Sequence, residues 1–248
     1  MNSVNTFSVG SKEYALYRPK YPDEIFEYLS SLCINHNRAL DCAAGTGQAA
    51  IGLAKFFQKV NAIDISQEQL NNANREPNIE YSLSKAEHTC FPNLSFDLIV
   101  VAQALHWFNY NTFWGEVDRI LQPGGVFAAW GYDWFSIDDK TDKIIEELIL
   151  NPIAPYWSKK NEILWSGYKK CGMPFDKINS PQFRIEKEIY PIELINYIKT
   201  WSAYKKYVAL KNNEYTIKKT LDKLNESWHT TPKNMTMNLH VLIGKKKC

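Results

Sequence analysis

The chain has 248 residues, enough for one large α/β domain with a substantial buried core. A formal net charge of +2 gives no basis for a broad nucleic-acid or membrane-surface footprint, and no apolar run reaches the roughly 18 residues of a membrane span. The five cysteines are odd in number and form no C-x-x-C pair, which argues against a disulfide framework and against a structural zinc site. No signal-peptide pattern opens the chain, so we expect a cytoplasmic protein with reduced thiols and no metal.

The first 132 residues alternate between helical and strand patterns. A helix is predicted at 23–32, where apolar residues recur at helical spacing. Strands are predicted at 38–45, 59–66, 78–84, 96–104 and 125–132. Helices are predicted between them at 48–57, 68–74 and 112–121, the last ended by Pro123-Gly124-Gly125. This alternation predicts a doubly wound, mostly parallel sheet with helices on both faces.

The rest of the chain is less regular. Helices are predicted at 139–150, 191–210 and 214–228, a loop at 151–160, and strands at 183–189 and 236–244. The two late strands would bring the sheet to seven strands, with an antiparallel edge. The helices between them have no place in the sheet pattern, so we expect them to form a cap over the strand ends.

The segment "LDCAAGTGQAAIGLA" places Gly45 and Gly47 between a strand and a helix. Glycines at such a turn let a ligand approach the backbone, at the strand ends where open α/β sheets bind ligands. Gly45, Gly47 and Ala50 also satisfy the dinucleotide pattern G-x-G-x-x-[GA]. Asp64 follows Gly45 by 19 residues, a spacing that suits a ribose-binding carboxylate in either class of cofactor, although it could be only a turn acid. A tight turn that binds nothing is a further interpretation.

Asp41 separates these interpretations. It lies within the first strand, where a carboxylate suits a cationic ligand such as S-adenosylmethionine and would repel a pyrophosphate. The stretch resembles the first motif of class I S-adenosylmethionine-dependent methyltransferases, in which a strand acid precedes a glycine-rich turn. Ala43 stands where that family usually has its first glycine.

The resemblance continues in order through residues 38–132. "AIDIS" resembles the second strand, which implies cofactor-binding positions at Asp64 and Ile65. "SKAEHTCFP" resembles the segment beside adenine and implies Ala86 and Glu87, although Glu87 could be only surface charge. "FDLIVVAQALHWF" resembles the fourth strand and implies that Gln103 borders the cofactor, and "ILQPGGVFAAW" resembles the turn before the fifth strand. The family's fold and its cofactor, with S-adenosylhomocysteine as product, are therefore expected.

A narrower resemblance, to the trans-aconitate methyltransferase-like subgroup, is carried by "YRPKYP", "QALHWF" and "TWSAY". It implies a small-molecule acceptor that presents oxygen, more a carboxylate than a hydroxyl. His106 is the candidate base for a hydroxyl. The candidate acceptor-site residues are Tyr17, Arg18, His106, Trp107, Trp134 and Trp201. Each also has a structural interpretation, as a solvated charge, a turn cap or a core aromatic.

The domain boundaries follow from this assignment. The chain divides into an N-terminal lid segment and helix (1–37), a cofactor-binding core (38–135), a helical cap with a late strand (136–235) and a closing strand with a tail (236–248). Three alternatives stay open: an NAD-dependent oxidoreductase, a non-catalytic cofactor-binding regulator, and an RNA-directed methyltransferase, which the near-neutral charge disfavours. No nucleic-acid or membrane partner is expected, and the sequence does not determine the oligomeric state.

Overall fold

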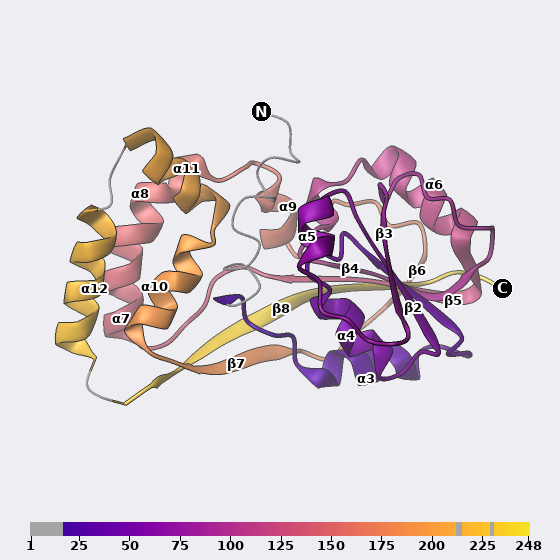
Figure 1. Ribbon diagram of the computed structural model, residues 1–248, viewed down its shortest axis with the longest axis horizontal. Coiled ribbons are helices and arrows are strands. Elements are labelled where there is room, and N and C mark those ends of the chain that lie inside the picture. The colour runs from indigo at the N-terminus through magenta and orange to yellow at the C-terminus, as the bar shows by residue number, and fades with distance from the viewer. Residues whose placement is uncertain (1–16, 212–214, 229–230) are drawn as a thin grey trace.

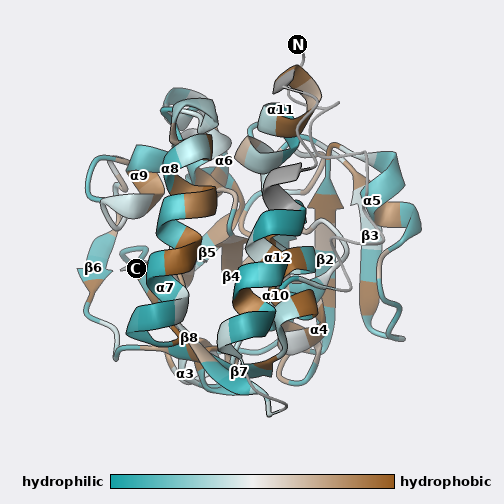
Figure 2. Cartoon of the chain, turned by 90° about the vertical axis from the view of Figure 1, so that its left-hand side faces the viewer, coloured by the Kyte–Doolittle hydropathy of each residue, from teal (hydrophilic) through white to brown (hydrophobic). Residues whose placement is uncertain are grey.

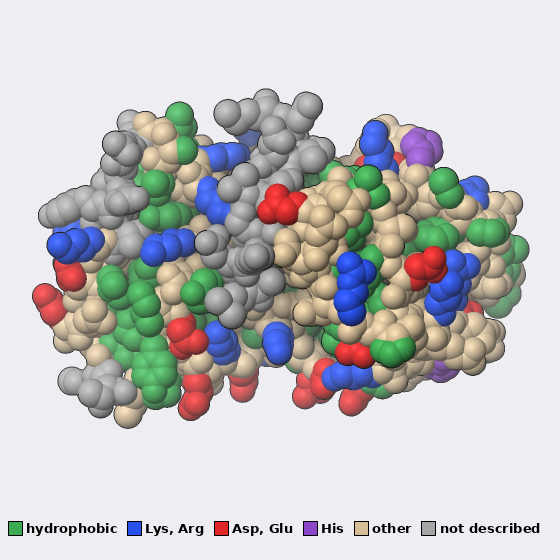
Figure 3. Space-filling model, in the orientation of Figure 1, with side chains coloured by type: hydrophobic (Ala, Val, Ile, Leu, Met, Phe, Trp, Pro, Cys, Tyr) green, Lys and Arg blue, Asp and Glu red, His purple; other side chains and the backbone are tan. Residues whose placement is uncertain are grey.

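The computed structural model describes residues 17–211, 215–228 and 231–248. Figure 1 shows a sheet flanked by helices on one side of the molecule and a group of helices on the other, with two long strands running between them. No helix in the described parts of the chain is long and apolar enough to cross a lipid bilayer. Acidic and basic side chains are interspersed on the face drawn in Figure 3, with no broad patch of one sign.

The sheet has eight strands, with β3-β2-β1-β4-β5-β8-β6 as its continuous order and β7 paired to β8. The first five strands pair in parallel and the last three pair antiparallel. All seven predicted strands are present, and the predicted antiparallel edge is confirmed. The strands are β1 (Arg38–Cys42), β2 (Lys59–Asp64), β3 (Ile79–Leu83), β4 (Phe96–Ala102), β5 (Leu121–Tyr132), β6 (Asp176–Ile178), β7 (Arg184–Ile189) and β8 (Lys233–Lys245).

Helices cover both faces of the sheet, as the alternating pattern predicts. On one face, α3 (Asp23–Ser31) and α4 (Gln48–Ala54) pack their buried apolar side chains against alternate residues of β1, β4 and β5. On the other face, α6 (Tyr110–Ile120) and α9 (Asn161–Trp165) pack against the intervening residues of the same strands. The short α5 (Gln67–Asn71) follows β2. The carboxyl ends of β1, β2 and β4 therefore meet at one edge, where the glycine turn lies.

The cap is built from α7 (Asp139–Ile145), η2 (Glu146–Leu150), α8 (Asn151–Ile153), η3 (Ala154–Tyr156), α10 (Pro191–Lys199), α11 (Ser202–Lys211) and α12 (Tyr215–Ser227). Figures 1 and 2 both show α7, α10 and α12 side by side. β8 joins the cap to the core: Leu239–Lys245 pair with β5, and Lys233–Asn238 pair with β7. One long strand thus serves both parts of the molecule.

Several predicted boundaries are wrong. β1 ends at Cys42, and the residues up to Gly45 belong to the turn. Helix α6 ends at Ile120, and Leu121 is already extended. Pro123-Gly124-Gly125 therefore lie within β5, at the point where its register with β4 shifts. The predicted loop at 151–160 contains α8 and η3, and the predicted helix at 191–210 is broken at Thr200–Trp201. The N-terminal lid segment lies outside the described residues as far as residue 16.

The cysteines agree with the reduced-thiol expectation. All five are free; Cys33, Cys42 and Cys171 are buried, and Cys90 and Cys248 are exposed. In residues 17–211, 215–228 and 231–248, no group of three His, Cys, Asp or Glu side chains is placed to hold a metal ion.

Candidate active site

The turn between β1 and α4 is held in shape by left-handed backbone at three positions. The φ angles of Ala43, Gly45 and Gly47 are 57°, 56° and 82°. The Ala44 N–H donates to the Ile63 carbonyl at 2.9 Å, and the Gly47 N–H donates to the Ala44 carbonyl at 2.8 Å. The Gly45 N–H donates to Asp64 Oδ2 at 2.9 Å. These three donors are already used within the protein, so they fix the shape of the turn.

A pocket, here called the loop pocket, opens beside this turn. Small side chains and main chain of the turn form one wall, and the ends of β4 and β5 form the other. Its lining residues are Arg18, Tyr21, Ala43, Ala44, Gly45, Thr46, Gln48, Ala49, Ala102, Gln103 and Tyr132. The sequence-predicted residues Ala43, Gly45 and Gln103 lie here together with Arg18, which was predicted as an acceptor-site residue and also lines the second pocket described below.

Asp41 is fully buried behind the turn and is not among the described residues that line the loop pocket. Neither carboxylate oxygen has a hydrogen-bond partner at standard geometry. Burial raises the pKa of Asp41 to about 8; the nearby Ala50 N–H opposes this shift, and the charge of Asp64 adds to it. At a pKa of about 8 the Asp41 carboxyl group is largely protonated at neutral pH, and a cation bound nearby would lower that pKa and favour the carboxylate. The contact of Asp41 with the cofactor stays a prediction.

Asp64 ends β2 beside the turn, as predicted, and its side chain is 9% exposed. Besides Gly45, it accepts a hydrogen bond from the Ser66 N–H at 2.8 Å. Burial raises the pKa of Asp64 despite these hydrogen bonds. Its neighbour Ile65 is 42% exposed. Asp64 thus holds the turn in place, and each of its oxygens keeps a lone pair that a ribose hydroxyl could use.

Three of the predicted cofactor-binding residues, Ala86, Glu87 and Gly47, have structural roles within the protein. Ala86 is buried in the core cluster beneath α6. Glu87 accepts a hydrogen bond from the Asn109 N–H at 3.1 Å, which ties the segment after β3 to the start of α6. Gly47 caps α4, and a Cβ there would stand 2.0 Å from the Tyr81 hydroxyl. None of these three lines the loop pocket in the described part of the chain.

Gln103 has an unusual conformation at the end of β4. Its φ is 55°, in the left-handed region that a residue with a side chain rarely adopts. Its amide Nε2 donates to the Tyr132 carbonyl at 3.1 Å, and its Oε1 accepts from the Tyr132 N–H at 3.1 Å. The side chain lies over Gly131, where a Cβ would stand 2.2 Å from Oε1. The partner of this polar residue is therefore the main chain of β5, and Gln103 aligns the two strand ends.

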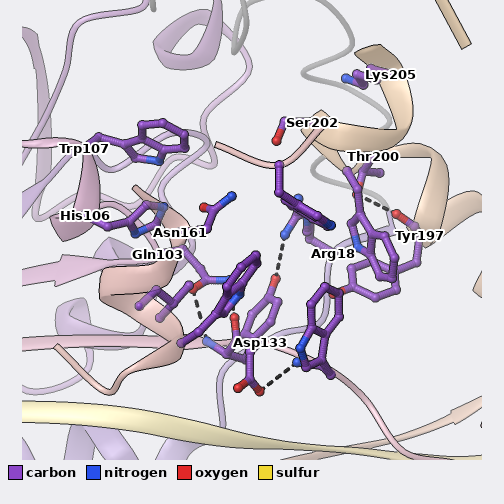
Figure 4. A pocket seen from close by; sticks show the side chains of 16 residues that line it. Arg18, Gln103, His106, Trp107, Asp133, Asn161, Tyr197, Thr200, Ser202 and Lys205 are labelled. Carbon is purple, nitrogen blue, oxygen red and sulfur yellow. Dashed lines mark hydrogen bonds between the residues drawn. The ribbon is translucent and has the colours of Figure 1, made fainter. Parts of the chain in front are cut away.

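A second pocket, here called the aromatic pocket, adjoins the first, because Arg18, Gln103 and Tyr132 line both. It is formed between the sheet and the cap (Figure 4). Four indole rings dominate it: Trp134 lies 5.5 Å from Trp165, 5.7 Å from Trp157 and 6.1 Å from Trp201, between ring centroids. Its other lining residues are His106, Trp107, Asp133, Asn161, Leu164, Tyr197, Thr200, Ser202 and Lys205.

The charged groups of the aromatic pocket are unequal in sign. Arg18 Nη1 donates to the Tyr132 hydroxyl at 3.2 Å, and its guanidinium lies 5.6 Å from the Tyr197 ring centroid. Lys205 adds a second cation. The one carboxylate among the described lining residues, Asp133, is engaged by His240 Nε2 at 2.9 Å and by the Trp134 N–H at 2.7 Å. The pocket therefore favours an anion.

His106 and Asn161 face each other across one side of this pocket (Figure 4). They are only 4% and 6% exposed, and neither His106 Nδ1 nor Asn161 Nδ2 has a hydrogen-bond partner among the described residues. Burial lowers the pKa of His106 to about 4, helped by the nearby Lys160. The ring is neutral at physiological pH and a weak base.

The aromatic pocket brings together five of the predicted acceptor-site residues: Arg18, His106, Trp107, Trp134 and Trp201. Tyr17 instead packs against the main core cluster. The sequence analysis missed Tyr132 and Asp133, which follow the parallel strand β5 and could have been found from that position alone. It also missed Trp157, Asn161, Trp165, Tyr197 and Lys205, for which the sequence carries no local signal.

Comparisons with known proteins agree with this geometry. The sequence model of a family described as "Methyltransferase domain" matches residues 40–129. A candidate methyltransferase of Dictyostelium discoideum is 32% identical over 245 residues, which cover 96% of this chain and 93% of that protein. A solved structure of a candidate type II methyltransferase from Anaeromyxobacter dehalogenans has a TM-score of 0.86 and 31% identity, covering 94% of this chain and 100% of that chain. A fatty-acid O-methyltransferase of Mycolicibacterium smegmatis is 29% identical over 100 residues, 38% of this chain and 36% of that protein.

The chain belongs to the class I S-adenosylmethionine-dependent methyltransferases. It is an enzyme of that class, with S-adenosylmethionine as its cofactor. The residues of the site fit this cofactor: small side chains line the turn, and a buried acidic side chain lies behind it. The oxidoreductase alternative is set aside.

Proposed function

We propose that this enzyme transfers the methyl group to a carboxylate oxygen of a small-molecule acceptor bound in the aromatic pocket. One observation carries the proposal: among the described residues, the pocket that joins the cofactor site is lined by the cations Arg18 and Lys205 and by no effective base. Arg18, Gln103 and Tyr132 line both pockets, so an acceptor group beside them would lie next to the methyl donor.

The two acceptor chemistries make opposite demands on such a pocket. When bound, S-adenosylmethionine supplies an electrophilic methyl group, and the protein orients the acceptor and excludes water. A hydroxyl acceptor must lose its proton, whereas a carboxylate is already ionised at neutral pH and attacks with a lone pair. His106, with a pKa of about 4, is a weak base. Hydrogen bonds from His240 and Trp134 lower the pKa of Asp133 although burial acts in the opposite direction, so Asp133 is also a weak base.

The aromatic pocket contains side chains that can bind a carboxylate. Asn161 Nδ2 is a buried donor without a partner among the described residues, and Arg18 supplies the opposite charge. The neutral His106 ring can donate one further hydrogen bond from either ring nitrogen. In this proposal Arg18, His106 and Asn161 bind the acceptor, and Asp64 and the turn at Gly45 hold the cofactor. The fatty-acid O-methyltransferase relative acts on a carboxylic acid by its name, which supports the same acceptor chemistry.

A panel of carboxylic acids and alcohols incubated with labelled S-adenosylmethionine tests the proposal. We expect a base-labile methyl ester and, at saturating S-adenosylmethionine, a rate that is nearly flat between about pH 6 and 8, because neither candidate base, His106 or Asp133, titrates there. His106→Gln, which keeps a donor but cannot act as a base, should retain this flat profile. A base-stable ether product, or a rate that rises with pH and is lost in His106→Gln, would overturn the carboxylate assignment.

A further inference from the structure

A third cavity, here called the cap pocket, lies beyond the indoles of the aromatic pocket. It is larger than the aromatic pocket and is built on η2, α8, η3 and the start of α9. Phe135, Ile145 and Leu150 provide an apolar lining. Trp134, Trp157 and Trp165 line both this cavity and the aromatic pocket.

These three indoles form a thin wall between the two cavities. Their ring centroids are 5.5–5.9 Å apart, so the wall consists of side chains in contact. Trp134 is 37% exposed. The indole N–H of Trp157 makes no hydrogen bond to any described residue. A wall of weakly tethered rings can shift to let a narrow apolar group pass, because rotation of these rings breaks few polar contacts.

Charge differs sharply across this wall. Among the described lining residues of the aromatic pocket, the cations are Arg18 and Lys205, and the one carboxylate is Asp133, which is paired with His240. Among those of the cap pocket, the acids are Asp142, Glu146 and Glu162, and the one cation is Lys159. An anionic group is therefore favoured on the first side and repelled on the second, whereas the apolar lining of the second side favours a neutral chain.

We infer that the acceptor is a monocarboxylic acid with an extended apolar chain, which crosses the indole wall and lies in the cap pocket. This inference rests on the proposed function, because it places the acid group beside Arg18 in the aromatic pocket. It excludes polycarboxylic acids as preferred acceptors, since a second carboxylate would lie near three acidic side chains.

Binding and turnover across a chain-length series test the inference. Straight-chain monocarboxylic acids, titrated into protein saturated with S-adenosylhomocysteine, should gain roughly threefold to fourfold in affinity for each added CH2 until the cap pocket is filled. The kcat/KM for methylation should rise in parallel. A dicarboxylic acid of the same length should bind at least tenfold more weakly than the monocarboxylic acid.

A variant that narrows the cavity and a matched control test whether the acceptor chain lies in the cap pocket. Ala154 lines the cap pocket, so Ala154→Phe should narrow the cavity and lower the long-chain to short-chain kcat/KM ratio at least tenfold. Glu147 lies on the same group of helices, is exposed and does not line the cavity. Glu147→Phe should keep the wild-type ratio, and calorimetric titration with S-adenosylhomocysteine verifies that both variants are folded.

The outcomes separate the two proposals. Length-dependent binding of acids that are never methylated would overturn the proposed function but retain the binding assignment of the cap pocket. Methylation of acids without any dependence on length, or with equal use of dicarboxylic acids, would overturn the inference and retain the proposed function. An unchanged ratio in Ala154→Phe would likewise overturn the placement of the chain in the cap pocket.

Discussion

The stability of the turn from Ala43 to Gly47 depends on which of its residues with left-handed backbone carry a side chain. At Gly47, a Cβ would meet the Tyr81 hydroxyl at 2.0 Å, and that hydroxyl donates to the Asn74 carbonyl at 2.7 Å. We expect Gly47→Ala to lower the free energy of unfolding by about 2–3 kcal/mol, because backbone strain and displacement of Tyr81 add.

Ala43→Gly is the matched control for this prediction. Ala43 already has a φ of 57°, so glycine removes strain while adding freedom to the unfolded chain. These effects offset each other, and we expect a change of less than about 1 kcal/mol. Urea unfolding measures both variants. A Gly47→Ala protein as stable as the wild type would show that the turn does not need glycine there.

Asp41 supplies a second prediction at this scale, through its pH dependence. Its folded pKa is raised from 3.8 to about 8, so the carboxyl group is most favourable to folding when protonated. Its contribution is fully present below about pH 4 and is lost as the pH rises towards 8. The isosteric Asp41→Asn variant carries no charge. It should therefore gain on the wild type across this range, by at least about 1 kcal/mol at pH 8.

Unfolding titrations of both proteins at several pH values, without cofactor, check this expectation. A variant that is less stable than the wild type at every pH would show that the carboxylate is ionised and well solvated or paired in the free protein.

At the scale of elements, a titratable pair of side chains links the end of β5 to β8, beside the main-chain pairing of these strands. Asp133 follows β5, and His240 lies in β8, where it pairs with Gly131. The hydrogen bond to Asp133 raises the pKa of His240 although burial opposes the shift. Stabilisation from this pair is therefore fully present below the ordinary histidine pKa and is lost as the pH rises through the raised value.

A double-mutant cycle of Asp133→Asn and His240→Gln measures the pair. Because both side chains are about one quarter to one third exposed, we expect a coupling of about 0.5–1 kcal/mol at pH 6 and almost none at about pH 9. A coupling that is equal at both pH values would show that the charge on His240 contributes nothing.

The short elements around the aromatic pocket are those that the sequence analysis missed. α9 has five residues and η1 (Leu105–Trp107) has three, too few to display a helical period. The break between α10 and α11 at Thr200–Trp201 contains neither proline nor glycine. Trp201 is 3% exposed and packs against Trp134, Trp157 and Tyr197, so tertiary contacts decide this break.

For the whole molecule, the cap and the sheet share one apolar cluster. It runs from α3, α4 and the sheet through Trp130 and Tyr132 to the cap residues Leu194, Leu224 and Trp228. We therefore expect the cap and the core to unfold in one cooperative transition. Trp134, Trp157, Trp201 and Trp228 report on the cap side, so tryptophan fluorescence weights the cap while far-ultraviolet circular dichroism reports on all helices and strands. The two urea transitions should coincide; a fluorescence midpoint well below that of circular dichroism would show that the cap unfolds independently.

Sequence by itself determined the class of the protein and seven of the eight strands of its sheet. Strand and helix periods are local, and the turn at Gly45 and Gly47, the acids at Asp41 and Asp64, and the strand end at Gln103 all stand at fixed distances along the chain. Only the tertiary structure decided how those residues are used. In the folded chain, Asp41 is buried and does not line the loop pocket, and the Gln103 side chain hydrogen-bonds to the main chain of β5. Burial also lowers the pKa of His106. Burial and desolvation arise from side chains distant in the sequence, and the aromatic pocket combines residues from Arg18 to Lys205 for the same reason.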